Sequence, residues 1–570
     1  MNAKMLQYCR SIAEAVDEGR IKDGKTLNAL KLKEGKRLGL ERLPSNPDIL
    51  ANLQKHSLKL REILSIKPLR TLSGVAPVAI MTKPISCPHG TCIYCPGGPE
   101  SFFGSVPQSY TGHEPATMRA ISNNFDSYLQ AMNRISQYYA TAHNPEKLEL
   151  IIMGGTFPSF PREYREEFVS CAFQAANDFS EMFFEGNGFS PEKFNEFFSH
   201  GEKHFGAEVK EKLLRMKRPA NIEREHARNE KAKARIVSLC IETKPDWCRE
   251  KEVNEMLGLG TTRVELGVQS IYNDVLKYTN RGHGVEDSVE ATRLLKDSGL
   301  KVAYHMMPGQ PLSSKEKDIE MFREIFANPD FRPDGLKIYP CMVMPGTALA
   351  RLYEKGRFTP LSTGEAAEII AEASRFIPYY ARVYRIQRDI PTKFALAGID
   401  RNNLRQIVEM KMSETGIKGR DIRARETGIN RGKGVEADYS EMKIVAGEYA
   451  ASSGTEIFIS IEDEKNDLIA GFCRLRKPFR PFRKEFTENT CCIRELHVFG
   501  PAVALGEKNP ESEQHKGFGK RLVLEAEKIA AEKFDAEKML VISGVGARDY
   551  YARKLGYGRE GAYMSKRLEK

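Results

Sequence analysis

Between Ala76 and about Pro391, short apolar segments alternate with amphipathic ones, and this alternation constrains the fold more than any other feature of the chain. Each apolar segment is five to ten residues long and is followed by a glycine, a proline or a polar break, as is typical of buried strands. The expected strands are VAIMT, LELIIMGGT, ARIVSLCIET, TTRVELGVQ, KVAYHMM and GLKIYP. Strand–helix alternation predicts a parallel α/β sheet, open or curled into a partial barrel, with its chemistry beyond the carboxyl ends of the strands.

The segment before this alternation, residues 1–75, is basic and shows helical periodicity. Residues 1–70 hold fifteen Lys or Arg against eight Asp or Glu, and so carry most of the net charge of +10. A basic helical segment suits contact with phosphates, although a solvated helix face explains the charge equally well. We assign residues 1–75 to this segment and residues 76–395 to the α/β domain.

Three further segments differ in composition from the α/β pattern. Residues from about 181 to 233 break the strand rhythm with a dense charged stretch, which predicts a partly helical insertion. Residues 396–436 contain an Arg- and Gly-rich stretch typical of a connector. Residues 437–570 show four alternating strands, then a helix, a strand and a short helix. This order predicts an antiparallel sheet with helices packed on it, an α+β domain of common size.

The composition also excludes several classes of protein. The chain has no run of 18 or more apolar residues, so we expect no membrane span. Its first residues, MNAKMLQYCRSIAEAVDEG, contain early acids and no apolar core, unlike a secretory signal. Eleven cysteines in 570 residues are too sparse for a disulfide scaffold. These features predict a cytoplasmic protein with reduced thiols.

Three of the cysteines, Cys87, Cys92 and Cys95, fall within nine residues in the stretch SCPHGTCIYCPGG, with the spacing C-x4-C-x2-C. Thiolates are soft metal ligands, and three in one loop can converge on a single cluster. A zinc site needs a fourth Cys or His at a matching distance, and His89 lies inside the loop itself. Three ligands without a clear fourth favour an iron–sulfur cluster with one open iron over a structural zinc clip or inert loop thiols.

Two later strand ends carry residues that suit a small ligand beside such a cluster. The sequence MGGT (Met153–Thr156) leaves its strand with two glycines, which permit close backbone approach. The sequence IETKPD places Glu242 at the end of the next strand, where a carboxylate can bind ribose hydroxyls or an amino group.

The C-terminal domain contains a second candidate site, QHKGFG (Gln514–Gly519), which directly opens a helix. Successive backbone N–H groups at a helix N-terminus form a pocket for a pyrophosphate. Between the strands RELHVFG and VISGV, this pattern resembles a GNAT acetyltransferase, whose loop binds coenzyme A while the preceding strand lies along the pantetheine. Tyr550 and Tyr551 are adjacent on a predicted helix and point about 100° apart. One can pack in the core while the other offers its hydroxyl to the thioester sulfur as a general acid or anchor.

The motifs CPHGTCIYCPGG, MGGTF, IETKPDWC, RVELGVQS and KIYP resemble the radical S-adenosylmethionine (SAM) domain of the catalytic subunit of Elongator. The resemblance covers about residues 20 to 570 and implies an α/β fold, a radical-SAM partial (β/α) barrel followed by an α+β GNAT acetyltransferase domain. It implies three cofactors, a [4Fe-4S] cluster, SAM and acetyl-CoA. The implied cluster ligands are Cys87, Cys92 and Cys95, and the implied SAM-binding residues are Gly154, Gly155, Thr156 and Glu242.

The resemblance also implies an acetyl-CoA site to which both domains contribute. Lys147 matches a lysine that reaches acetyl-CoA in that family, which implies one shared cavity; from the sequence alone it is a charged residue before a strand. Lys147 and Tyr551 are the implied catalytic residues. The structural alternative is that Tyr550 and Tyr551 both pack in the core. The implied acetyl-CoA contacts are Lys147, Glu495, Leu496, His497, Val498, Gln514, Gly517, Phe518, Gly519, Lys520 and Tyr551. Of these, Glu495–Val498 would bind through backbone groups.

The implied activity is modification of the wobble uridine 34 of tRNA at carbon 5, by an acyltransferase. Carbon 5 of uracil is a poor nucleophile toward a thioester, so a radical route fits. A 5′-deoxyadenosyl radical would abstract hydrogen from the methyl group of acetyl-CoA, the carbon radical would add to C5, and thioester hydrolysis would leave a carboxymethyl group. The tRNA would splay its anticodon base into the cleft, with its stem held by the basic segments. Other implied partners are an electron donor and either a second copy of the chain or accessory subunits.

Two rival functions remain open. A protein lysine acetyltransferase with a structural iron–sulfur cluster explains the C-terminal domain, but it leaves the strand-end motifs and Lys147 without roles. A non-catalytic tRNA-binding scaffold leaves both cofactor loops unexplained. The chain departs from some family members in its connector, where GRDIRARE (Gly419–Glu426) has no cysteine, so we expect no connector zinc.

Overall fold

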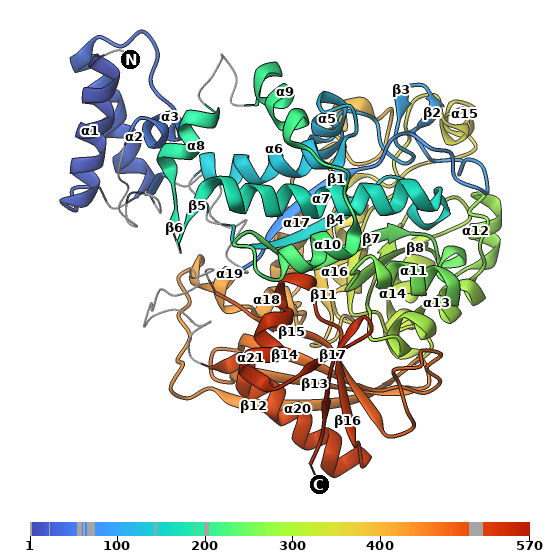
Figure 1. The fold of residues 1–570 in the computed structure, drawn as a ribbon. Coiled ribbons are helices and arrows are strands. Elements are labelled where there is room, and N and C mark those ends of the chain that lie inside the picture. Colours follow the sequence, from blue (N-terminus) through green and yellow to red (C-terminus); the bar gives the residue numbers. More distant parts are fainter. Residues whose placement is uncertain are drawn as a thin grey trace.

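The computed structural model organises the chain around two seven-stranded sheets (Figure 1). The residues that it describes are 3–21, 23–53, 60, 63–64, 74–141, 143, 145–186, 188–198, 205–500 and 517–569. All eleven cysteines lie within these ranges as free thiols. No helix within them is both long and apolar enough to cross a membrane.

The first sheet is parallel throughout, and its strands stand side by side in chain order. They are β1 (Ala76–Met81), β4 (Lys147–Met153), β7 (Arg235–Thr243), β8 (Arg263–Gln269), β9 (Lys301–Met306), β10 (Gly335–Ile338) and β11 (Arg382–Ile386). The first six correspond to the expected strands. The seventh, β11, was not predicted, because two arginines interrupt its short apolar pattern. Arg382 pairs with the carboxylate of Glu426 at 2.6 Å, which lets a charged residue occupy this strand.

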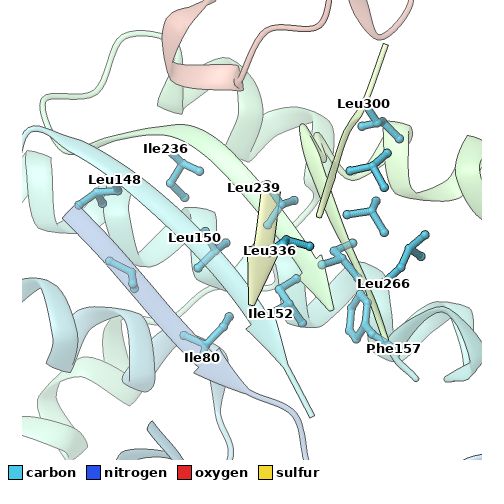
Figure 2. Close-up of a cluster of buried hydrophobic side chains, with 14 of the residues drawn as sticks. Ile80, Leu148, Leu150, Ile152, Phe157, Ile236, Leu239, Leu266, Leu300 and Leu336 are labelled. Carbon is cyan, nitrogen blue, oxygen red and sulfur yellow. The ribbon is translucent and has the colours of Figure 1, made fainter. Parts of the chain in front are cut away.

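The core of this domain lies between the sheet and the helices on its outer face. Every second residue of β4 is buried, so that Leu148, Leu150 and Ile152 point into one apolar layer (Figure 2). Each such side chain contributes about 1.5–3 kcal/mol when it is fully buried. The helices α6 (Ser127–Ala140) and α7 (Arg162–Phe183) cover the start of the sheet (Figure 1).

The other elements of this domain connect the strands. Its helices are α5 (Pro115–Ser122), α11 (Glu250–Gly258), α12 (Asn273–Tyr278), α13 (Val285–Asp297), α14 (Lys315–Ala327), α15 (Ala348–Glu354) and α16 (Thr363–Ala373). A small hairpin, β2 (Gly98–Ser101) with β3 (Gly104–Val106), follows the cysteine loop. The expected insertion consists of β5 (Phe184–Glu185), β6 (Gly188–Phe189), α8 (Pro191–Phe198), α9 (Ala207–Met216) and α10 (Ile222–Asn229).

The flanking segments are helical. The N-terminal helices α1 (Ala3–Asp17), α2 (Gly24–Leu38) and α3 (Asn46–Ala51) share a small core of their own at one side of the molecule (Figure 1). Helix α2 begins at a capping box in which Asp23 accepts a hydrogen bond from the Thr26 backbone N–H. Between the two sheets, the chain forms α17 (Leu404–Glu414), α18 (Ile422–Arg425) and α19 (Thr427–Arg431).

The second sheet has the strand order β12-β13-β14-β15-β16-β18-β17. Its strands are β12 (Lys443–Ala451), β13 (Gly454–Asp463), β14 (Leu468–Lys477), β15 (Thr490–Val498), β16 (Lys538–Val541), β17 (Gly558–Glu560) and β18 (Tyr563–Arg567). Its helices are α20 (Phe518–Phe534) and α21 (Arg548–Leu555). The prediction of an antiparallel sheet is wrong for one pair, since β15 and β16 are parallel. The reason is that α20 crosses over between them and returns the chain in the same direction.

A buried ionic network joins the two sheets. Asp334, just before β10, accepts two hydrogen bonds from the Arg494 guanidinium of β15, at 2.7 and 2.8 Å. Arg494 also pairs with Glu456 of β13 at 2.8 Å and donates to the Leu300 carbonyl at 2.9 Å. Although burial opposes ionisation, Arg494 and Lys296 hold the pKa of Asp334 well below its ordinary value. Asp334, Arg494, Glu456 and Lys296 each have an oppositely charged partner, which is the condition under which buried charges are tolerated.

The substitution Asp334→Asn should lower the free energy of unfolding by about 3–5 kcal/mol, because it leaves Arg494 buried without its anionic partner. As a control, Glu166→Gln removes the partner of Arg162 in an exposed pair at 2.7 Å and should cost less than about 1 kcal/mol. Urea unfolding followed by circular dichroism measures both. Equal effects of the two substitutions would contradict a stabilising role of the interface network.

Candidate active sites

The cysteine loop begins where β1 ends and crosses the carboxyl edge of the parallel sheet. Cys87 and Cys92 are buried and Cys95 is partly exposed, and all three line one cavity. Two tight turns shape the loop, since the Gly90 N–H donates to the Cys87 carbonyl at 3.0 Å and the Cys95 N–H to the Cys92 carbonyl at 2.9 Å. The structure therefore brings the three predicted ligands together at the predicted edge.

Each of the three sulfurs has a hydrogen-bond donor from a different part of the chain. The Thr156 hydroxyl lies 3.3 Å from Cys87 Sγ, Arg281 Nη1 lies 3.4 Å from Cys92 Sγ, and Gln108 Nε2 lies 3.3 Å from Cys95 Sγ. Burial raises the pKa of Cys87 and Cys95, and these donors act against it. Donors to sulfur favour the thiolate form that ligates iron. The donor set therefore fits a cluster held by three thiolates.

His89 also approaches the cluster loop, with Nε2 3.3 Å from Cys92 Sγ. Burial, together with the nearby Lys244 and Arg281, lowers the pKa of His89 to about 4. The ring is therefore neutral at physiological pH.

The predicted SAM-binding residues are only partly brought to this cavity. Gly155, Thr156 and Glu242 line it, whereas Gly154 does not. Gly154 has φ +114°, and a Cβ there would lie 2.3 Å from Thr82 Oγ1, so this glycine serves close packing against the end of β1. The Thr156 hydroxyl donates to Cys87 Sγ, so this residue lines the cavity and contacts the cysteine loop.

Glu242 belongs to a charged cluster on the inner face of the sheet. Its carboxylate accepts from the Tyr110 hydroxyl at 2.9 Å and from Lys337 Nζ at 2.8 Å. Lys337 also pairs with Glu265, which His305 Nε2 approaches at 2.8 Å. Glu242, Glu265 and His305 are close enough to hold a metal ion, but the Lys337 ammonium already supplies the cation between the two carboxylates.

From this cluster, ion pairs continue along the inner face toward the amino ends of the strands. Arg263 pairs with Glu265 at 3.0 Å and with Glu149 at 2.6 Å. The guanidinium also stacks over the Tyr384 ring, 4.7 Å from its centroid. The inner face of the sheet is therefore lined by paired charges rather than by an apolar core.

Several residues at this cavity were not predicted from the sequence. Gln108, Tyr110, Arg281 and His305 line it, and Lys337 binds its Glu242 carboxylate. The loop residues among them carry no spacing signal. For the strand residues, the charged side chains within the expected strands could have shown it. A strand covered on both faces normally consists of apolar residues, so charged residues in its sequence indicate that one face borders a polar interior.

The second site lies where β15 and β16 separate. β15 pairs with β14 as far as Val498, but with β16 only from Thr490 to Ile493. The backbone edge of Glu495–Val498 that faces β16 therefore has no ladder partner in the described chain, as binding of pantetheine through backbone groups requires. α20 begins at Phe518 opposite this edge, after Gly517 with φ +75°.

Three elements of the predicted acetyl-CoA site meet at Gly519. A Cβ on Gly519 would lie 2.9 Å from the Tyr550 hydroxyl and 3.8 Å from Leu496 Cδ2. Lys520 follows in the first turn of α20. Gln514 lies outside the described residues.

The two tyrosines of α21 have different surroundings. Tyr551 is 5% exposed and belongs to the core of the second domain, with its ring centroid 5.9 Å from that of Tyr557. Burial raises the pKa of Tyr551 well above its ordinary value. Tyr550 is half-buried, and its hydroxyl is the one beside Gly519. The choice of Tyr551 as the acetyl-CoA contact stays a prediction.

The side chain of Glu495 is engaged in the domain interface. It pairs with Arg474 at 2.9 Å and with Lys301 of β9 at 3.3 Å. Burial opposes its ionisation, yet these two cations lower the pKa of Glu495 to about 2. Its backbone is therefore the part left for a ligand. The His497 ring stacks on Phe472, with ring centroids 5.9 Å apart.

Lys147 begins β4, at the opposite end of that strand from the cysteine cavity, and it does not line the cavity. It stands in register with Arg235 of β7. Arg235 packs against the turn η6 (Val545–Ala547), which leads into α21. The structure thus places Lys147 on the side of the first domain that faces the second domain. Burial and the charge of Arg235 lower the pKa of Lys147 to about 8.

Four family models match the chain. The model of the ELP3 N-terminal domain matches residues 5–72, that of the Radical SAM superfamily residues 210–324, and that of the Radical_SAM C-terminal domain residues 333–414. The model of the acetyltransferase (GNAT) family matches residues 430–557. These matches confirm the predicted fold class, and the two superfamilies imply the three predicted cofactors.

Relatives match over nearly the whole chain. A tRNA uridine(34) acetyltransferase of Methanocaldococcus infernus is 48% identical over 557 residues, which cover 96% of this chain and 97% of that protein. Elongator complex protein 3 of Saccharomyces cerevisiae is 41% identical over 552 residues, covering 95% and 92% of the two chains. The solved structure of Methanocaldococcus infernus Elp3, which lacks its N-terminus, covers 87% of this chain and 100% of its own, with 44% identity and a TM-score of 0.71.

The half-barrel with three converging thiols, the GNAT sheet with its separated strands and these matches agree with one another. The chain belongs to the family of Elongator complex protein 3 and the tRNA uridine(34) acetyltransferases, with a radical SAM domain followed by a GNAT domain.

Proposed function

We propose that the protein modifies the wobble uridine 34 of tRNA, placing a carboxymethyl group on carbon 5 with acetyl-CoA as the carbon donor and SAM as the radical source. The observation that carries the proposal is that one chain holds a cavity with three thiols and a place where β15 and β16 separate, with its two sheets joined by buried ion pairs. The names of the relatives support the substrate. We place this activity in the cytoplasm, where thiols stay reduced.

In this proposal Cys87, Cys92 and Cys95 would hold the cluster at the carboxyl edge of the sheet. When bound, the cluster would supply the electron that cleaves SAM to a 5′-deoxyadenosyl radical. The chain's own residues position the reactants: Glu242, fixed by Tyr110 and Lys337, presents a carboxylate to the cavity at a constant orientation. Although burial opposes its ionisation, Lys337 holds the pKa of the neighbouring Glu265 well below its ordinary value.

The proposed tRNA contacts lie on the flanking segments. Helix α2 exposes Lys25, Lys33 and Lys36 to solvent, and the segment before α18 exposes Arg420. Lysines and arginines that contact phosphates give sequence-independent, salt-sensitive binding. At the cavity itself, Arg388 stacks over the Tyr110 ring, 5.5 Å from its centroid, which suits an extruded base and its phosphate. An electron donor, and a second copy or accessory subunits, complete the proposed partners.

The substitution Cys92→Ser should abolish 5-carboxymethyluridine formation, because two thiolates cannot hold the cluster. The assay incubates the reconstituted protein anaerobically with tRNA, SAM, acetyl-CoA and dithionite, followed by mass spectrometry of the nucleosides. Cys171→Ala, which removes a buried thiol of α7 far along the chain from the loop, serves as the matched control and should keep most of the activity.

The same assay separates the rival function. If both proteins acetylate a peptide amine and neither modifies tRNA, the chain is a protein lysine acetyltransferase. If SAM is cleaved and tRNA stays unmodified, the radical domain acts on another substrate.

Lys147 should react with amine-directed reagents with a midpoint near pH 8, because burial and Arg235 favour its neutral form. The neutral fraction rises as pH rises through the pKa, so labelling should be nearly complete at a pH where an ordinary lysine, with a pKa of about 10.4, is still protonated. Peptide mass spectrometry after brief labelling measures this.

Acetyl-CoA should protect Lys147 from labelling if the lysine contacts it, while the exposed lysines of the same sample provide the reference. If the labelling of Lys147 has the same pH dependence as that of the exposed lysines, Lys147 does not belong to the acetyl-CoA site. The same conclusion holds if acetyl-CoA leaves the labelling of Lys147 unchanged.

A further inference from the structure

The segment Thr279–Gly284, which follows α12, is joined directly to the cysteine loop. The Ile93 N–H donates to the Thr279 carbonyl at 3.2 Å, and Asn280 Nδ2 donates to the Thr91 carbonyl at 2.9 Å. Gly282 has φ +69°, and a Cβ there would lie 2.5 Å from His89 Cβ. The two segments are therefore packed so closely that only glycine fits between them.

Within this segment, Arg281 is fixed against the cluster side of the cavity. It is 7% exposed, its Nη2 donates to the Gly267 carbonyl of β8 at 2.6 Å, and its Nη1 lies 3.4 Å from Cys92 Sγ. Its Nε is buried and has no acceptor in the described part of the chain. The guanidinium is thus held by the backbone of one element and points toward a ligand of the cluster.

The charge of Arg281 has no carboxylate partner within ion-pair distance among the described residues, whereas the neighbouring Lys244 pairs with Asp246 at 3.2 Å. A buried cation destabilises the folded protein unless an anion lies beside it. Three thiolates around a cluster core provide this anion, and one-electron reduction makes it more negative. A fixed cation at this position stabilises the reduced state more than the oxidised state.

We propose that Arg281 sets the reduction potential of the cluster held by Cys87, Cys92 and Cys95, by placing one uncompensated positive charge and one hydrogen bond at the Cys92 sulfur. This role rests on the cluster that the proposed function includes, but not on the identity of the substrate. Arg281 acts through Cys92 and is therefore a positioning residue for the electron-transfer step. It raises the potential, so that a weaker reductant suffices.

The test is a redox titration of the reconstituted full-length protein without SAM or tRNA, followed by the electron paramagnetic resonance signal of the reduced cluster. Arg281→Gln keeps a neutral donor and removes the charge, and its midpoint should shift to a more negative potential. A tenfold loss in the equilibrium constant for reduction corresponds to about 59 mV for a one-electron couple. Arg281→Lys keeps the charge and should recover most of the shift.

Arg385→Gln is the matched control, because it removes an arginine from the same cavity whose charge is already paired with Asp389. Its midpoint should equal that of the unsubstituted protein. The proposal is wrong if the midpoint potential of Arg281→Gln equals that of the unsubstituted protein. It is also wrong if Arg281→Lys or Arg385→Gln shifts the midpoint potential as much as Arg281→Gln does.

Cluster loading provides the second measurement, by iron and sulfide content. If Arg281→Gln holds no cluster, Arg281→Lys should still load one, at a midpoint close to that of the unsubstituted protein. Loss of the cluster in both variants would assign Arg281 a purely structural role. Because the titration uses neither tRNA nor acetyl-CoA, its outcome is independent of whether uridine 34 is the substrate.

Discussion

The buried ion pairs around Asp334 hold the two domains in one arrangement, which sets where the two candidate sites lie relative to each other. Arg494, Arg474 and Arg476 project from the GNAT sheet and are fully buried against the half-barrel. Arg476 reaches Asp297, at the end of α13, at 2.9 Å. Since a misplaced buried charge is expensive, such a network tolerates little sliding between the sheets. It therefore fixes β15 beside the amino ends of β9 and β10.

This arrangement separates the two sites along the strands of the half-barrel. Lys147 starts β4 and Met153 ends it, which at about 3.3 Å per residue puts the two ends roughly 20 Å apart. The cysteine cavity lies at the Met153 end, and the GNAT domain lies near the Lys147 end. The inner face between them carries the row of paired charges from Glu149 to Glu242. The proposed joint chemistry therefore has to bring the acetyl group from the Lys147 end to the cysteine cavity.

Local pattern predicted much of this structure from the sequence. Apolar alternation placed six of the seven strands of the half-barrel, because strands such as β4 bury alternate residues in one layer. A helix opening at the glycine motif was predicted, and α20 begins there, directly after Gly517. The cysteine spacing placed the three thiols in one loop because they are close in the chain.

What the sequence did not show depends on residues that are distant in the chain. The hydrogen bond from Arg281 to Cys92 joins positions 189 residues apart, and that from Tyr110 to Glu242 joins positions 132 apart. No local pattern encodes such pairs. The parallel β15–β16 pair was missed for a similar reason, since strand direction depends on the crossover by α20 rather than on either strand. Gly154 and Gly155 were predicted together from one motif, and of the two only Gly155 lines the cavity.

The proposed function requires both sites to act on the same acetyl group. Acetyl-CoA deuterated in its acetyl methyl group, supplied with SAM, tRNA and reductant, tests it in one reaction. Under the proposed function, the released 5′-deoxyadenosine contains deuterium and the carboxymethyl group of the nucleoside keeps two deuterium atoms. Unlabelled 5′-deoxyadenosine, together with an acetylated product that keeps all three deuterium atoms, would contradict it.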